Sequence, residues 1–169
     1  MEIVVMHFRR LDAREHCKPE AVVAALNLSD QATFDELLAA VTEAHGKPIE
    51  LKEIDNTVIP TVTGLWIEKE HKSVIVLPAQ DSRLHRNHAT YHEFGHILLN
   101  HDGCGLSPTD KVPSIFKHIG ARHGIKRILA RSLEWNDTER AAEHVAYLLS
   151  LAVLPLEHKS TSDLERMFG

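Results

Sequence analysis

The stretch ATYHEFGHILL, at residues 89–99, places an H-E-x-x-H motif between apolar flanks. The run has helical character, and residues four apart on a helix lie about 40° apart around the axis and roughly 6 Å apart along it. His92 and His96 can therefore both contact one tetrahedral metal ion. Phe94 points to the opposite side of this helix and is expected to face the core. Gly95 is expected to leave free space beside the metal.

Glu93 is the candidate catalytic residue of this motif. It flanks the two histidines on the helix without sharing their direction, so it is expected not to bind the metal itself. From that position it can accept a proton from a water molecule held by the metal. The stretch thus predicts one zinc ion per chain, and the ordinary alternative is a surface glutamate beside two unliganded histidines.

The composition sets the broad class of protein. The 169 residues are enough for one domain with a proper core and too few to favour two, so residues 1–169 are predicted to form a single domain. Apolar residues make up 43 % of the chain and the net charge is −5, without a long basic run, which makes direct nucleic-acid binding a poor expectation. No 18-residue apolar stretch or signal-peptide pattern is seen, so no membrane partner is expected. Cys17 and Cys104 form no disulfide framework, which favours a cytoplasmic protein.

Hydrophobic periodicity and turn residues give the expected order of elements. Helices are predicted at residues 19–26 and, after a cap at Ser29 or Asp30, up to His45. Strands are predicted at 48–54, 64–69 and 73–77, followed by the H-E-x-x-H helix with Asp81 or Ser82 as its cap. The second half is expected to hold a loop at 100–113, short helices within 114–133, a long helix at 138–153 capped by Asn136 or Asp137, and a last short helix at 161–168. The fold class is therefore α+β, with a small, mostly antiparallel three-stranded sheet packed with the H-E-x-x-H helix and a helical C-terminal half.

A zinc ion that takes part in catalysis usually has three protein ligands, so a third one is needed. His88 continues the stripe of His92 and His96, but His88 and His96 are roughly 12 Å apart along the axis, too far to share one ion. The long helix at 138–153 offers carboxylates instead. One face of it carries Glu139, Ala142, Glu143, Ala146 and Ser150, with Tyr147 at its edge. The small residues on this face would let the helix pack close to another helix.

Glu139 is the predicted third metal ligand. Glu143 could then orient His92 or His96 by accepting the hydrogen bond of the far imidazole nitrogen, or it could be the ligand itself. A competing explanation makes Glu139 the N3 residue of a capping box that starts at Asn136. The donor that would stabilise an oxyanion is left open among Tyr147, His144, His118 and His123.

The two helices together resemble the ImmA/IrrE family of bacterial zinc metallopeptidases. HEFGHILL at residues 92–99, followed by ERAAEHVA at residues 139–146, is similar to the family pattern H-E-[LIF]-[GA]-H-x-[LI]-[LF] and then E-x-x-A-[ND]-x-F-A. The resemblance covers about residues 30–155. It implies a zincin-like fold and a zinc-dependent endopeptidase. It also implies that the protein cleaves or regulates a partner transcription factor, a helix-turn-helix repressor of the Xre type encoded nearby, as in mobile-element control, stress responses or toxin-antitoxin systems.

The chain departs from the family pattern at several positions. His88-Ala89 stands where the family has an aromatic-Thr pair, Glu143 replaces Asn or Asp, Val145 replaces Phe, and the closing Leu154-Pro155 comes three residues late. These departures favour an alternative function, a binding module that sequesters a repressor with a structural or vestigial metal. The intact Glu93 favours the peptidase, because a purely structural site needs no such carboxylate. Hydrolysis of a small amide is a third hypothesis.

Overall fold

The computed structural model describes residues 18–57, 63–100, 125–130 and 137–153, and these residues form an α+β fold, as predicted. The helices are α1 (Pro19–Ala24), α2 (Phe34–His45), α3 (Arg83–Leu98) and α5 (Asp137–Val153). The strands are β1 (Ile49–Ile54), β2 (Leu65–Lys69), β3 (Ser73–Pro78) and β4 (Ile125–Ala130). The H-E-x-x-H motif lies in the third and fourth turns of α3, where the sequence predicted it.

The strands form a mixed sheet in the order β1-β3-β2-β4. β2 and β3 are an antiparallel hairpin, closed by the hydrogen bond from Lys69 N to Lys72 O at 2.8 Å, and β2 also pairs antiparallel with β4. β1 runs parallel to β3, with Ile49 opposite Ser73. The three predicted strands are therefore present, but β4 joins them and the β1 edge is parallel. The hairpin turns β3 back into line with β1, which makes their pairing parallel.

The fourth strand lies in a region that the sequence predicted as helical, residues 114–133, and that prediction is wrong for residues 125–130. The run IKRILA is short and has apolar residues at both ends of a Lys-Arg pair, a pattern that does not decide between a strand and a short helix. Pairing with β2 at residues 65–69 satisfies its backbone and decides for the strand. β2 and β3 therefore each have a neighbour on both sides, and neither is an edge strand of the sheet.

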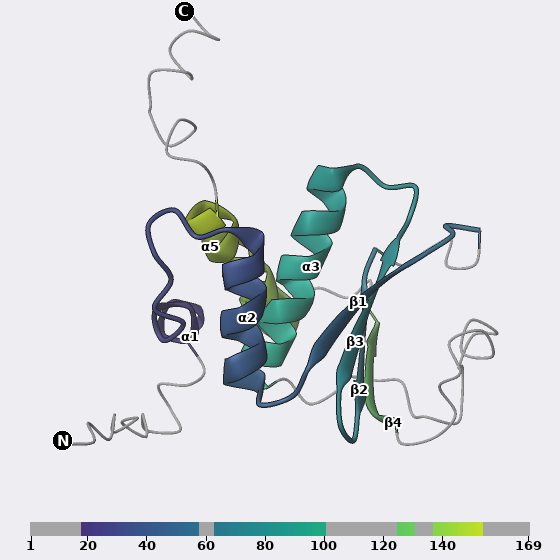
Figure 1. Cartoon of the computed structure of the whole chain (residues 1–169), viewed down its shortest axis with the longest axis horizontal. Coiled ribbons are helices and arrows are strands. Elements are labelled where there is room, and N and C mark those ends of the chain that lie inside the picture. Colours follow the sequence, from purple (N-terminus) through teal and green to yellow (C-terminus); the bar gives the residue numbers. More distant parts are fainter. Residues whose placement is uncertain (1–17, 58–62, 101–124, 131–136, 154–169) are drawn as a thin grey trace, which may run out of the picture.

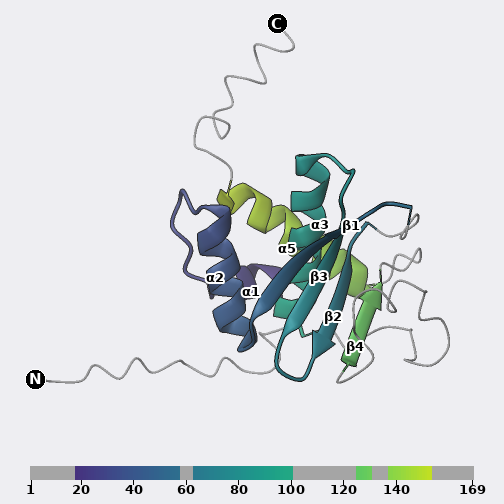
Figure 2. The same cartoon turned by 45° about the vertical axis from the view of Figure 1, so that its right-hand side comes forward.

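The described helices all lie on one face of the sheet, and α3 lies between the sheet and α5 (Figures 1 and 2). α2 begins with a capping box in which Thr33 Oγ1 accepts from Glu36 N at 3.2 Å and Glu36 accepts from Thr33 N at 2.7 Å. The predicted caps Ser29 and Asp30 are wrong, because only Thr33 has a glutamate three residues later. Ser82 caps α3 by accepting from His85 N at 3.2 Å, one of the two residues expected.

One hydrophobic core joins these elements. Phe94 of α3 is fully buried in it, as predicted, together with Trp66 and Ile75 of the sheet and Leu149 of α5. α3 is enclosed on every side from residue 89 to 97, so its polar residues are buried along with its apolar ones. The metal-site residues therefore lie inside the protein rather than on its surface.

Several predictions fall on residues outside the described ranges: the loop at 101–113, the helices at 114–124 and 161–168, the cap at Asn136, and the side chains of Cys17, Cys104, His118 and His123. Among the described residues, no helix is both long enough and apolar enough to cross a membrane.

Candidate metal centre

Two turns of α3 bring the imidazoles of His92 and His96 together. Their ring centroids lie 4.8 Å apart at 77° to each other, and the two Nε2 atoms are 3.1 Å apart. Both residues are buried, with 6 % and 2 % of their surfaces exposed. The spacing of four residues thus gives two nitrogens aimed at one point, as the motif predicted.

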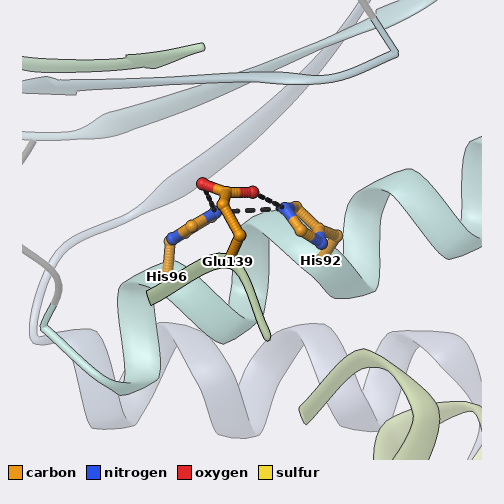
Figure 3. Close-up of side chains that lie close together, drawn as sticks. All are labelled: His92, His96 and Glu139. Atoms are coloured by element: carbon orange, nitrogen blue, oxygen red, sulfur yellow. Dashed lines mark hydrogen bonds and ion pairs between the residues drawn. The ribbon is translucent and has the colours of Figure 1, made fainter. Parts of the chain in front are cut away.

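Glu139, in the first turn of α5, adds a carboxylate to the pair (Figure 3). Its Oε2 lies 3.2 Å from His92 Nε2 and its Oε1 lies 3.6 Å from His96 Nε2. The residue is 7 % exposed. Because the carboxylate lies over the two histidines, the alternative in which it folds back to cap α5 is disfavoured.

These three residues are a group that can hold a metal ion, since one donor atom from each lies within 4.8 Å of the others. A tetrahedral ion with bonds of 2.0–2.1 Å places its ligand atoms about 3.3 Å apart. The two Nε2 atoms are 3.1 Å apart, and the nearest Glu139 oxygen lies 3.2 Å from His92 (Oε2) and 3.6 Å from His96 (Oε1), all close to that value. Burial of a carboxylate is costly unless a positive charge compensates it, and a divalent cation at this point would do so.

Glu143, one turn further along α5, lies behind His92 rather than beside Glu139. Its Oε2 is 3.0 Å from His92 Nδ1, which donates the hydrogen bond. With its proton on Nδ1, neutral His92 presents the lone pair of Nε2 toward His96 and Glu139, as a metal ligand must. Of the two roles that the sequence left open for Glu143, its position fits that of orienting His92.

His88 is the residue that sequence reasoning missed. Its distance from His96 excludes it as a ligand of the same ion, but it contacts the site in another way. Its Nε2 lies 3.0 Å from Oε1 of Glu143, so one carboxylate contacts two imidazoles of α3. The four-residue spacing of His88 and His92 was the signal in the sequence that one partner could serve both.

The two helices can come this close because of Gly95. A Cβ atom at Gly95 would lie 2.6 Å from the carbonyl oxygen of Ala142 and 2.9 Å from its Cα. The sequence interpretation expected free space at this glycine, and that was wrong, because the backbone of α5 fills it. The prediction of close packing by small residues of α5 is confirmed, since Ala142 and Ala146 are fully buried.

Glu93 is buried, with 2 % of its surface exposed, and its carboxylate lies beside Gly64, the residue that precedes β2. A Cβ atom at Gly64 would lie 2.8 Å from Glu93 Oε1. Glu93 and His92 also line a cavity of about 240 Å³, whose other walls include Thr63, Asp81, His85 and His88. A ligand in this cavity would therefore contact both the candidate catalytic carboxylate and one of the candidate metal ligands.

The two candidate oxyanion donors on α5 lie elsewhere. His144 Nε2 is 3.4 Å from Glu20 Oε1 of α1, on the side of α5 turned away from Glu139. Tyr147 is 58 % exposed, and it follows Glu139 by eight residues, or about 12 Å along the helix. Neither position supports the role predicted for it.

Comparisons of the chain with protein-family models, with curated proteins and with solved structures find no match. The resemblance to the ImmA/IrrE family, and the zincin-like fold that it implies, therefore stay predictions from the two sequence motifs. The geometry of the site is the firmer basis for a function.

Proposed function

We propose that this protein is a zinc-dependent endopeptidase that cleaves or regulates a helix-turn-helix repressor. The observation that carries the proposal is the buried group of His92, His96 and Glu139, next to a buried Glu93 that lines the same cavity as His92. Glu93 belongs to the motif but is not one of the grouped ligands. That division of roles, three ligands and a neighbouring carboxylate, is the one that zinc peptidases use.

The donor set supports zinc as the metal. Imidazole nitrogens and one carboxylate oxygen suit a borderline ion with tetrahedral preference. Structural zinc sites usually have four protein ligands, whereas catalytic sites have three and keep one position open. The group found among the described residues has three, which favours the catalytic kind of site.

When bound, zinc lowers the pKa of a coordinated water and polarises the carbonyl of a substrate. Glu93 then accepts a proton from the attacking water and delivers it to the leaving nitrogen of the peptide bond. Burial beside Gly64 restrains the carboxylate for these transfers. Glu143 keeps the Nε2 lone pair of His92 directed at the ligand group throughout.

The proposed substrate comes from the resemblance, which implies a repressor of the Xre type encoded nearby. The cavity of about 240 Å³ beside Glu93 is the proposed place where part of that substrate binds. A substrate strand added to β2 or β3 is not proposed, because both are interior strands.

The test uses the zinc-loaded full chain and the repressor encoded beside it. The wild type is expected to bind one zinc per chain and to cleave the repressor, with fragments identified by mass spectrometry. Glu93→Gln is expected to keep the zinc and to lose cleavage by a factor of about 10² to 10⁴, the usual contribution of a general base.

Two results would count against the peptidase. Cleavage at the wild-type rate by Glu93→Gln would remove Glu93 from the chemistry. Bound zinc and a stable complex with the repressor, without cleavage by either form, would favour a binding module that sequesters its partner.

A further inference from the structure

We propose that His88 is a positioning residue for the metal centre, and that it acts on His92 through Glu143. The proposal rests on the metal ion of the proposed function but not on peptide cleavage. Each oxygen of the Glu143 carboxylate is assigned to a different imidazole, Oε1 to His88 Nε2 and Oε2 to His92 Nδ1, both at 3.0 Å. His88 and His92 are one turn apart on α3, and Glu143 reaches both from α5.

Of the two contacts made by Glu143, the one with His92 lies next to the metal centre. A metal-binding imidazole is oriented by the hydrogen bond that its other nitrogen makes, and loss of that bond typically costs ten- to a hundredfold in metal affinity. His92 has only 8 % of its side chain exposed, so few water molecules can replace Glu143 as the acceptor. The position of the Glu143 carboxylate therefore matters for the metal.

His88 restrains the side chain of Glu143. The Glu143 side chain is 32 % exposed, and a partly exposed glutamate retains much of its rotamer freedom. The contact with His88 restrains the second oxygen and so selects the rotamer in which the first oxygen meets His92. His88 itself is 45 % exposed and, in the part of the chain that the structure describes, its ion pair is with Glu143 and not with His92, His96 or Glu139, so its effect on the metal passes through Glu143.

His85 is a matched control for His88. It lies one turn earlier on α3, lines the same cavity and carries the same side chain. In the described part of the structure its contact is a backbone one, the hydrogen bond from His85 N to Ser82 Oγ at 3.2 Å, and it makes no ion pair with Glu143. Substitution of His85 removes a histidine from the cavity but leaves the contacts of His88 and His92 with Glu143 unchanged.

The experiment measures zinc affinity of the full chain by competition with a chromophoric chelator, with no substrate present. His88→Ala is expected to raise the Kd for zinc about tenfold, at the lower end of the range for residues behind a metal ligand. His88→Gln, whose amide can still donate to Glu143, is expected to recover most of the affinity. His85→Ala is expected to bind zinc as the wild type does.

A double-mutant cycle with Glu143→Ala separates positioning from general destabilisation. If His88 acts through Glu143, then adding His88→Ala to Glu143→Ala has no further effect on the zinc affinity. Wild-type affinity in His88→Ala, or an equal tenfold loss in the Glu143→Ala background, would overturn the proposal. A wild type that binds zinc but cleaves nothing overturns the proposed function alone, and a wild type that binds no zinc overturns both.

Discussion

Gly64, which immediately precedes β2, lies against Glu93 of α3: a Cβ atom on the glycine would lie 2.8 Å from Oε1 of the glutamate. The two residues are brought together by the packing of the sheet on α3, and neither belongs to the metal-ligand group. The lack of a side chain at residue 64 therefore leaves the room that the candidate catalytic carboxylate occupies.

Gly64→Ala is expected to displace the carboxylate of Glu93 and to leave the metal centre intact. The displaced atoms are the end of a flexible side chain, so the fold can adjust, and we expect the free energy of unfolding to change by less than about 1 kcal/mol. A misplacement of about 1 Å can reduce a catalysed rate about 10²-fold. Zinc content and kcat for repressor cleavage measure the two effects separately. Loss of zinc together with activity would mean that Gly64 supports the whole site instead.

Gly95→Ala is expected to act on the metal centre, because the atom it would meet is the backbone oxygen of Ala142 at 2.6 Å. No side chain can move aside there, so α3 and α5 must separate. We expect a loss of about 1–3 kcal/mol in unfolding free energy, partly offset by the better helix propensity of alanine, and a weaker affinity for zinc.

Gly46→Ala is the control for this substitution. Gly46 has a φ of 73° and no atom within 4 Å of an added Cβ, so its replacement strains only the backbone at the end of α2. A destabilisation of about 1 kcal/mol without a change in zinc affinity is expected. Equal zinc affinities in both alanine variants would contradict the account of Gly95.

Glu139→Ala is expected to abolish tight zinc binding, because it removes one of the three grouped ligands from a site with 7 % exposure. Glu143→Ala is expected to lower the affinity ten- to a hundredfold without abolishing it. Metal analysis after gel filtration separates the two cases. Full zinc content in Glu139→Ala would show that the ligand assignment is wrong.

Removal of the metal is expected to destabilise the fold, because the ligands come from two helices that are together only in the folded chain. Free zinc at a hundred times its Kd stabilises the folded state by about 2.7 kcal/mol. Thermal unfolding with and without a chelator measures this shift. The shift in Tm should vanish in His96→Ala. A wild type whose Tm does not change with zinc would contradict a zinc site in the folded state.

The capping box of α2 predicts a dependence of stability on pH. The backbone N–H and the hydroxyl of Thr33 lower the pKa of Glu36 below its ordinary value of 4.5. The carboxylate therefore stabilises the folded state fully above about pH 4.5, and this contribution is lost as the pH falls through the lower pKa of the folded protein. Unfolding experiments on the wild type and Glu36→Gln should differ at neutral pH, and the difference should shrink as the pH falls below 4.5; a difference that stays constant into strong acid would contradict this explanation.

The parts of the site that depend on helix geometry could be predicted from the sequence. The direction of His92 and His96, the burial of Phe94 and the small residues of α5 all depend on periodicity within one helix. What could not be predicted depends on contacts between elements far apart in the chain. The parallel pairing of β1 and β3 is set by the β2–β3 hairpin, and β4 is a strand only because β2 accepts it.

The role of His88 shows the same limit at the level of one side chain. The four-residue spacing of the histidines on α3 was visible in the sequence, but Glu143, the carboxylate that contacts His88, lies on α5. Likewise, the sequence allowed for free space at Gly95, and only the position of Ala142 shows that the space is taken. Local rules therefore locate the candidate ligands, while the residues that support them come from the tertiary structure.

The close approach of Gly64 and Glu93 means that two properties of the site can change separately in evolution. The candidate metal ligands lie on α3 and α5, whereas the placement of the Glu93 carboxylate also depends on Gly64, which belongs to neither helix. In the proposed peptidase, a single codon change at residue 64 would therefore move the carboxylate of Glu93 while the group of His92, His96 and Glu139 is kept.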